Sequence, residues 1–150
     1  MMLTEDFYLQ VRRSIPIACC DLLVIDSMAR VLLLRRRNHP AQGQWWFPGG
    51  RILYLEERSD ACLRILRSEC GIHVSQAQEL GTFDVLLENP ATSEVHHGIT
   101  TLYGVRVEAG IPVCLDEQSI DHGWRTSPQW SCEHLHTFVS GAMTLHDRIA

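Results

Sequence analysis

The stretch that most constrains this chain runs from Phe47 to Ile72 and reads FPGGRILYLEERSDACLRILRSECGI. A Pro-Gly-Gly turn leads into a loop that carries Glu56, and a helical segment with Arg64 and Glu69 follows and ends at Gly71. Glycine lets a backbone approach a ligand closely, and carboxylate oxygens are preferred ligands of Mg²⁺. The stretch therefore predicts a turn and a helix that together hold a phosphate-bearing ligand through a cation.

Length and composition limit the class of protein. The chain has 150 residues, of which 45% are hydrophobic and 21% charged, and these values predict one globular domain over residues 1–150. The formal net charge of −5 argues against a general surface for nucleic acid or anionic membranes, since such surfaces need excess Lys and Arg. The longest apolar region, residues 15–34, contains Asp21, Asp26 and Arg30, so we expect no membrane span there.

The cysteines and the first residues bear on the compartment. Six cysteines are present, and no two of them form a C-x-x-C pair, so neither a zinc site nor a redox motif is indicated. We expect reduced, buried thiols. The first residues, MMLTEDFYLQVRRS, have no apolar core typical of a secretory signal. Together these features predict a cytoplasmic protein.

Hydrophobic periodicity predicts alternating helices and strands. Thr4 is a candidate cap for a first helix over residues 4–13, and residues 88–98 are expected to form a polar loop that contains His96 and His97. Residues 116–124 (DEQSIDHGW) are expected to be a polar connection, and a further helix is expected within the last 20 residues. The expected strands are 15–25, 31–34, 80–87, 99–107 and a short one at 112–115.

Two charged features lie close to the Gly-rich turn in sequence. Asp21 interrupts an apolar strand, so it is either an edge residue facing water or a carboxylate aimed at a ligand. Arg36 belongs to an arginine triplet that precedes the turn, and alternation along a strand turns its side chain away from those of Arg35 and Arg37. Such a triplet is usually a solvated charge run, but here it leads directly into the turn.

The spacing from Gly50 to Ile72 resembles the Nudix box. That pattern is Gly, five residues, Glu, seven residues, then Arg-Glu-aliphatic-x-Glu-Glu-x-Gly-aliphatic. This chain has Ile65 and Ser68 at two positions where the common box has glutamates. The string RRRNHPAQGQWWFPGGRI, the later DEQ before a Trp, and EDF near the start are similar to the GDP-mannose mannosyl hydrolase branch, in which both glutamates are normally absent. The resemblance covers roughly residues 5–130.

The resemblance implies a Mg²⁺ site, with Mn²⁺ as an alternative ion. The protein ligands would be the Gly49 carbonyl, the Glu69 carboxylate and the Gln118 amide oxygen, with water and phosphate completing about six oxygens. Arg64 precedes Glu69 by five residues, about 140° around a helix, so the two side chains do not pair directly. The expected task of Arg64 is to brace the loop that carries Glu56.

The resemblance also implies substrate contacts and a reaction. Arg36 and Arg51 would hold the diphosphate, where a planar guanidinium can bind phosphate oxygens in a fork. Asp21 would lie near the sugar and Phe7 would contact substrate. Tyr103 would lie near the phosphates, although a half-buried strand aromatic explains it equally well. In this branch water attacks the anomeric carbon and releases GDP and free sugar.

The general base of that branch is a histidine directly after DEQ, and here Ser119 occupies the position. A serine hydroxyl cannot act as a base near neutral pH, and a general base is worth ~10²–10⁴ in rate. In one reading, another histidine acts as the general base: His122 or His97, or less readily His96. In the second, attack is at phosphorus in another nucleotide derivative, with a metal-bound hydroxide or a carboxylate such as Glu117 as activator. In the third, it binds nucleotide sugars with little catalysis.

The expected architecture is the Nudix α/β (α+β) fold, a mixed sheet between helices with the box as loop-helix-loop. The expected partner is a nucleotide-sugar substrate, with no nucleic acid and no membrane. The resemblance also implies a homodimer, in which the EDF region near the N-terminus is exchanged between subunits.

Overall fold

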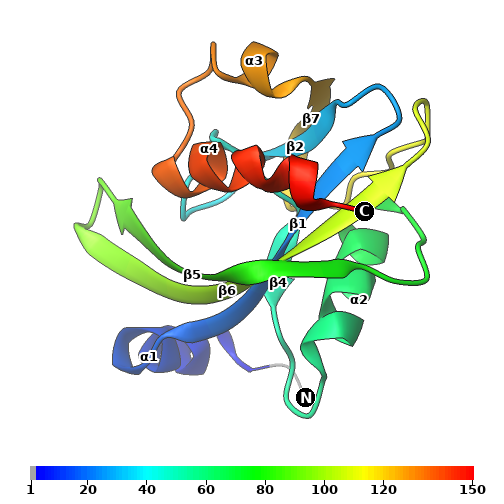
Figure 1. Ribbon diagram of the computed structural model, residues 1–150. Coiled ribbons are helices and arrows are strands. Elements are labelled where there is room, and N and C mark those ends of the chain that lie inside the picture. The colour runs from blue at the N-terminus through cyan, green and yellow to red at the C-terminus, as the bar shows by residue number, and fades with distance from the viewer. Residues whose placement is uncertain (1–2) are drawn as a thin grey trace.

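The computed structural model describes residues 3–150 and contains a mixed sheet with helices on both faces (Figure 1). The strand order is β3-β2-β1-β6-β5, with β4 paired to β1 and β7 paired to β2. β1 and β6 run parallel, and the other pairs are antiparallel. The elements are α1 (Glu5–Ser14), β1 (Ile17–Asp26), β2 (Val31–Arg36), β3 (Trp45–Trp46), β4 (Gly49–Arg51), α2 (Arg58–Cys70), β5 (Gln78–Asn89), β6 (Glu94–Val107), β7 (Ser119–Arg125), α3 (Ser127–Trp130), α4 (Thr137–Met143) and the 3₁₀ helix η1 (Thr144–Arg148). The predicted α/β class with a mixed sheet between helices is confirmed.

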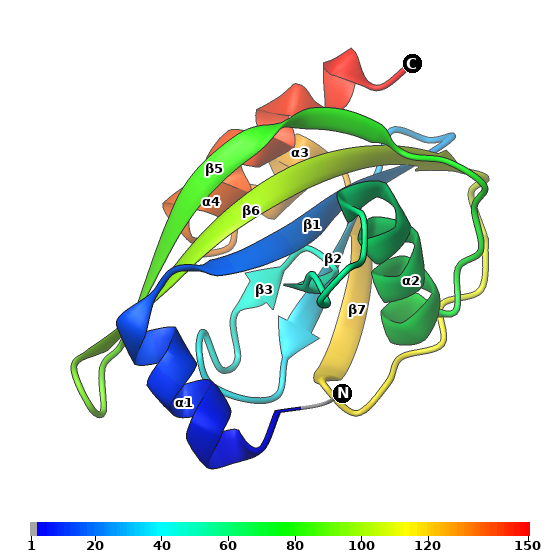
Figure 2. The same cartoon turned by 90° about the horizontal axis from the view of Figure 1, so that it is seen from below.

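The central strand β1 is covered on both faces. Its alternating side chains enter two separate cores, because successive residues of a strand point to opposite faces of the sheet. Leu23 and Ile25 join a core with α3 and α4, whereas Leu22 and Val24 join a core with α2. Figure 2 shows α2 on one face of the sheet and α4 on the other. This double burial explains why the strand is apolar apart from Asp21 and Asp26.

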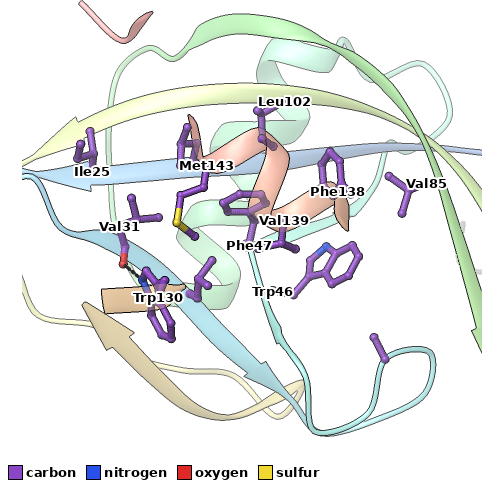
Figure 3. Close-up of a cluster of buried hydrophobic side chains, with 14 of the residues drawn as sticks. Ile25, Val31, Trp46, Phe47, Val85, Leu102, Trp130, Phe138, Val139 and Met143 are labelled. Atoms are coloured by element: carbon purple, nitrogen blue, oxygen red, sulfur yellow. Dashed lines mark hydrogen bonds between the residues drawn. The ribbon is translucent and has the colours of Figure 1, made fainter. Parts of the chain in front are cut away.

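The core beneath α4 is rich in aromatic side chains (Figure 3). Phe138 of α4 packs against Trp46 and Phe47, with ring centroids 5.8 and 5.9 Å apart. Trp130 is fully buried, and its indole N–H donates to the Val31 carbonyl over 2.9 Å. Trp46 and Phe47 thereby fix the chain that enters the Gly-rich turn, since Pro48 follows directly.

The first helix has a different position. The Thr4 hydroxyl accepts the Phe7 N–H at 3.3 Å, so Thr4 caps the helix as predicted. No residue of α1 is buried. α1 lies beside the tip of the β5–β6 hairpin (Figure 2), where Arg12 and Arg13 both bond to Glu94 of β6.

Three predicted elements differ in the structure. The expected loop 88–98 is a tight turn, because β5 extends to Asn89 and β6 begins at Glu94. Residues 112–115 form no strand, whereas the polar segment that follows forms the strand β7. Its residues pair with β2 at the sheet edge, where polar side chains meet water without cost. None of the helices described in residues 3–150 is long and apolar enough to cross a membrane.

Candidate active site

The Gly-rich turn is held between β1 and the helix of the box. Gly49 pairs with Asp21 across β1 and β4, and its N–H donates to the Glu69 carboxylate at 3.1 Å. A Cβ at Gly49 would come 2.9 Å from the Cys20 carbonyl oxygen and would also collide with the Asp21 carboxylate. Only glycine fits here, because the strand and the carboxylate approach the backbone from the same side.

Arg64 organises the loop between the turn and the helix. Its guanidinium donates to both carboxylate oxygens of Glu56, at 2.6 and 2.8 Å, and to the Arg51 carbonyl at 2.9 Å. These hydrogen bonds lower the pKa of Glu56. The pair therefore fixes the loop and the backbone of Arg51, which is the bracing geometry expected from the sequence.

Asp21 is buried, so the interpretation of it as a water-facing edge residue is wrong. One of its oxygens accepts the Thr100 hydroxyl at 2.6 Å, and the other accepts the Trp46 indole N–H at 3.1 Å. Burial raises the pKa of Asp21 to about 6, and the two hydrogen bonds oppose that shift. The carboxylate is thereby fixed beside the Gly49 backbone and faces a cavity.

The cavity has a volume of about 370 Å³, within the range of small-molecule sites. Although the chain is acidic overall, three arginines line it, and Asp21 is the one acidic side chain in its wall among residues 3–150. The walls come from α1, β1, β2, the 37–44 loop, β3, β4, β5, β6 and Gln118. The lining residues are Tyr8, Arg12, Ile17, Cys19, Asp21, Arg36, His39, Pro40, Trp46, Gly49, Gly50, Arg51, Val85, Leu87, His96, His97, Gly98, Thr100 and Gln118. This lining suits an anionic ligand.

The cavity arginines are held in defined positions. Arg36 donates from Nε to the Pro40 carbonyl at 2.7 Å, which leaves the rest of its guanidinium for a ligand. Arg51 lies over the ring of Tyr8, with 4.2 Å between the guanidinium carbon and the ring centroid. Arg12 bonds to Glu94, and its buried Nε has no partner within residues 3–150. Two of the three, Arg36 and Arg51, are those expected at a diphosphate.

Two of the expected cation ligands, Gly49 and Gln118, line the cavity, and the third, Glu69, accepts the Gly49 N–H. Glu69 is 8% exposed, and burial together with the carboxylates of Asp116 and Asp21 raises its pKa to about 8. A buried carboxylate near two others fits a divalent cation, whose charge offsets theirs. No three His, Cys, Asp or Glu side chains gather as a metal cluster within residues 3–150. The oxygens expected to bind the cation remain those of the Glu69 carboxylate, the Gly49 carbonyl and the Gln118 amide, and Asp116 and Asp21 add negative charge near Glu69.

Several expected residues do not reach the cavity. Tyr103 is 4% exposed and belongs to the core under α2, on the opposite face of β6. His122 is exposed on β7 and Phe7 is exposed on α1, and neither lines the cavity. Ser119 is buried at the start of β7, paired with Arg36. The expected contacts of Tyr103, His122 and Phe7 with substrate are thus not supported by this geometry.

Strand alternation separates the two adjacent histidines of β6. His96 is an even number of residues from Thr100 along β6, so the two side chains point to the same face of the strand. Thr100 donates to Asp21, and His96 therefore lies on the cavity face. The side chain of His97 points to the other face of β6, and its ring nitrogen Nε2 lies 3.3 Å from the Asp84 carboxylate. Burial and the positive charges of Arg12 and Arg36 lower the pKa of His96, which favours the neutral imidazole.

Among the cavity residues that sequence reasoning missed are Tyr8, Arg12, Thr100 and Trp46. Tyr8 and Arg12 are four residues apart on α1, and such spacing places side chains on one helix face. That spacing was the available signal. Thr100 and Trp46, the partners of Asp21, come from separate strands and no local pattern connects them to it.

The family assignment follows from a comparison of the whole chain with known families. The family model described as NUDIX domain matches residues 18–134, which is most of the chain. This chain belongs to the Nudix hydrolase family. The match includes the Gly-rich turn, the helix α2 and Gln118, whereas the cavity residues Tyr8, Arg12 and Ile17 lie before it.

Relatives of this Nudix chain agree with the assignment. The low-salt glycan biosynthesis protein Agl8 of Haloferax volcanii is 32% identical over 109 residues, which cover 69% of this chain and 67% of that protein. A MutT protein of Methanosarcina mazei Go1 is 22% identical, with a TM-score of 0.74 over 89% of this chain and 94% of that one. The NUDIX domain of Shewanella oneidensis NrtR, complexed with ADP ribose, is 18% identical, with a TM-score of 0.73 over 97% and 98%. The two structures establish the fold.

Proposed function

We propose that this Nudix protein hydrolyses a nucleoside diphosphate sugar in the presence of Mg²⁺, with a GDP-sugar such as GDP-mannose or GDP-glucose as substrate. The observation that carries the proposal is the cavity in which Arg36 and Arg51 lie beside the turn that holds Glu69. Two guanidiniums and one carboxylate match a ligand that has two phosphates and a bound cation.

The substituted box supports one cation rather than several. Ile65 is 2% exposed, and its side chain lies 3.7 Å from the position of a Cβ on Gly50. Ser68 is exposed, and its hydroxyl bonds to the Ile65 carbonyl. An apolar contact therefore replaces a carboxylate under the turn, and Glu69 is the acidic side chain left there.

The proposed bond cleavage is between the anomeric carbon and the diphosphate oxygen. Arg36 and Arg51 hold the leaving diphosphate, on which negative charge develops as the bond breaks. The Gly49 carbonyl, Glu69 and Gln118 would hold Mg²⁺, which supplies further positive charge to that diphosphate. Asp21 is fixed by Thr100 and Trp46 and can accept a sugar hydroxyl with its remaining lone pairs.

A neutral histidine in the cavity wall is the proposed acceptor of the proton from water. Of the histidines weighed from the sequence, His96 and His97 both line the cavity and His122 does not. The His97 ring is turned to Asp84, whereas His96 lies on the same face of β6 as Thr100. The name of the Haloferax relative, a glycan biosynthesis protein, is consistent with a sugar nucleotide.

Hydrolysis in ¹⁸O-labelled water tests the proposal. The protein is incubated with Mg²⁺ and GDP-mannose, GDP-glucose and a panel of other nucleotide sugars, and the products are analysed by mass spectrometry. Attack at the anomeric carbon puts the label in the free sugar. Label in a phosphate product would show attack at phosphorus, and absence of products despite tight binding would show a binding protein; either result rejects the proposal.

A further inference from the structure

In the segment before β7, one carboxylate, that of Asp116, accepts hydrogen bonds from both the backbone and the side chain of Gln118. Asp116 accepts the Gln118 backbone N–H at 3.0 Å with one oxygen and the Gln118 side-chain Nε2 at 3.1 Å with the other. Gln118 lines the cavity and is one of the three expected cation ligands. The Asp116 side chain does not line the cavity.

The chemistry of this pair fixes the orientation of the amide. An ionised carboxylate only accepts hydrogen bonds, so the NH₂ group of Gln118 has to face Asp116. The amide oxygen then lies on the other side of the amide carbon, away from Asp116. A glutamine without such a partner can rotate by about 180° and present its NH₂ group instead, which a cation does not bind.

The backbone around this pair is anchored at both ends. The Cys114 N–H donates to the Cys70 carbonyl at 2.8 Å, which ties the segment to the end of α2. The Arg37 N–H donates to the Gln118 carbonyl at 2.9 Å, which ties it to the end of β2. The remaining freedom of Gln118 is that of its side chain, and Asp116 restricts it.

We propose that Asp116 is a positioning residue of the cation site and turns the Gln118 amide oxygen toward the place where the cation binds. The inference rests on the cation site of the proposed function but not on its substrate. Partners of metal ligands typically change metal affinity by about 10–100-fold when they are lost. Asp116 should have an effect of that size through Gln118.

The test measures Mn²⁺ binding directly, without substrate, from the electron paramagnetic resonance signal of free Mn²⁺. In Asp116→Ala we expect the Kd for Mn²⁺ to rise about 10–100-fold. The matched control is Asp121→Asn in β7, three residues after Gln118. It removes an exposed carboxylate that accepts the neighbouring His122 N–H. Its Kd should stay within about twofold of wild type.

A double-mutant cycle separates positioning from simple charge. Asp116→Ala is compared in the wild type and in a Gln118→Ala background, because an effect transmitted through Gln118 disappears when Gln118 is absent. We expect most of the loss to vanish in that background. Asp116→Asn serves as a second variant, since an asparagine can donate to the amide oxygen and turn it away; its Kd should rise in the same direction.

Three results would overturn the inference: an unchanged Kd in Asp116→Ala and Asp116→Asn, an equal loss with and without Gln118, or a comparable loss in Asp121→Asn. Thermal unfolding of each variant checks that it is folded at the assay temperature. Mn²⁺ binding with the expected cycle but without hydrolysis of any sugar nucleotide rejects the proposed function and leaves this inference standing. Hydrolysis of a sugar nucleotide together with an unchanged Kd for Mn²⁺ in the Asp116 variants supports the proposed function and rejects this inference.

Discussion

The substitution Glu56→Gln should destabilise the fold, and the size of this loss of stability should depend on pH. Arg64 donates to both oxygens of Glu56, and the side chains are 32% and 16% exposed. Glutamine keeps one acceptor but turns an NH₂ group toward the guanidinium. Hydrogen bonds to charged groups are worth ~1.5–3 kcal/mol, and partial exposure reduces this, so we expect Glu56→Gln to cost about 2 kcal/mol at pH 7.

The melting temperature reports this loss. For a domain of this size 1 kcal/mol corresponds to ~2–4 °C, so the Tm of Glu56→Gln should fall by about 4–8 °C at pH 7. The matched control is Glu57→Gln, an exposed neighbour without a side-chain capping bond, which should change stability by less than about 0.5 kcal/mol. Calorimetry or circular dichroism measures both variants.

The sign of the pH dependence follows from the lowered pKa of Glu56. A depressed folded-state pKa gives stability that is fully present above the ordinary value of 4.5 and is lost as the pH falls through the folded-state value. The difference in Tm between wild type and Glu56→Gln should therefore narrow progressively below pH 4.5. A difference that stays constant from pH 7 to strongly acidic conditions would refute an ionic role for the pair, and so would an equal loss in Glu57→Gln.

Three further predictions concern the cavity. Gly49→Ala should cost about 1–3 kcal/mol in unfolding free energy because its Cβ collides with its neighbours, whereas Gly50→Ala, with its nearest side chain at 3.7 Å, should cost less in the same denaturation assay. His96→Ala should lower kcat by ~10²–10⁴ if it takes the proton from water, whereas His122→Ala should leave kcat unchanged; equal effects in steady-state assays would contradict this assignment. Thr100→Val removes a buried donor to a carboxylate and should cost ~1–3 kcal/mol, measured by urea denaturation, and a neutral result would argue against that hydrogen bond.

The sequence predicted well what depends on local spacing. The cap at Thr4, the two strands around the 26–30 turn and the helix that ends at Gly71 each follow from patterns within a few residues. The bracing of Glu56 by Arg64 follows from the box, since a loop carboxylate and a helix arginine eight residues apart can meet.

Other features depended on packing between distant segments, which spacing does not encode. Asp21 is buried because Trp46 and Thr100, from two other strands, each supply a donor. The 88–98 region and β7 were expected to be loops because they are polar. Both contain strand residues, since side chains at a sheet edge or facing a cavity need not be apolar. As a result His96 was expected in a loop, and the alternation that turns it to the cavity could not be used.

The position of α1 has an evolutionary consequence. The helix buries no residue of its own, yet it supplies Tyr8 and Arg12 to the cavity wall. Substitutions on this helix can therefore alter the ligand contacts without disturbing the packing of either hydrophobic core, since no residue of α1 belongs to them. Within this fold, α1 is a place where ligand preference can diverge between related proteins without a compensating change in the core.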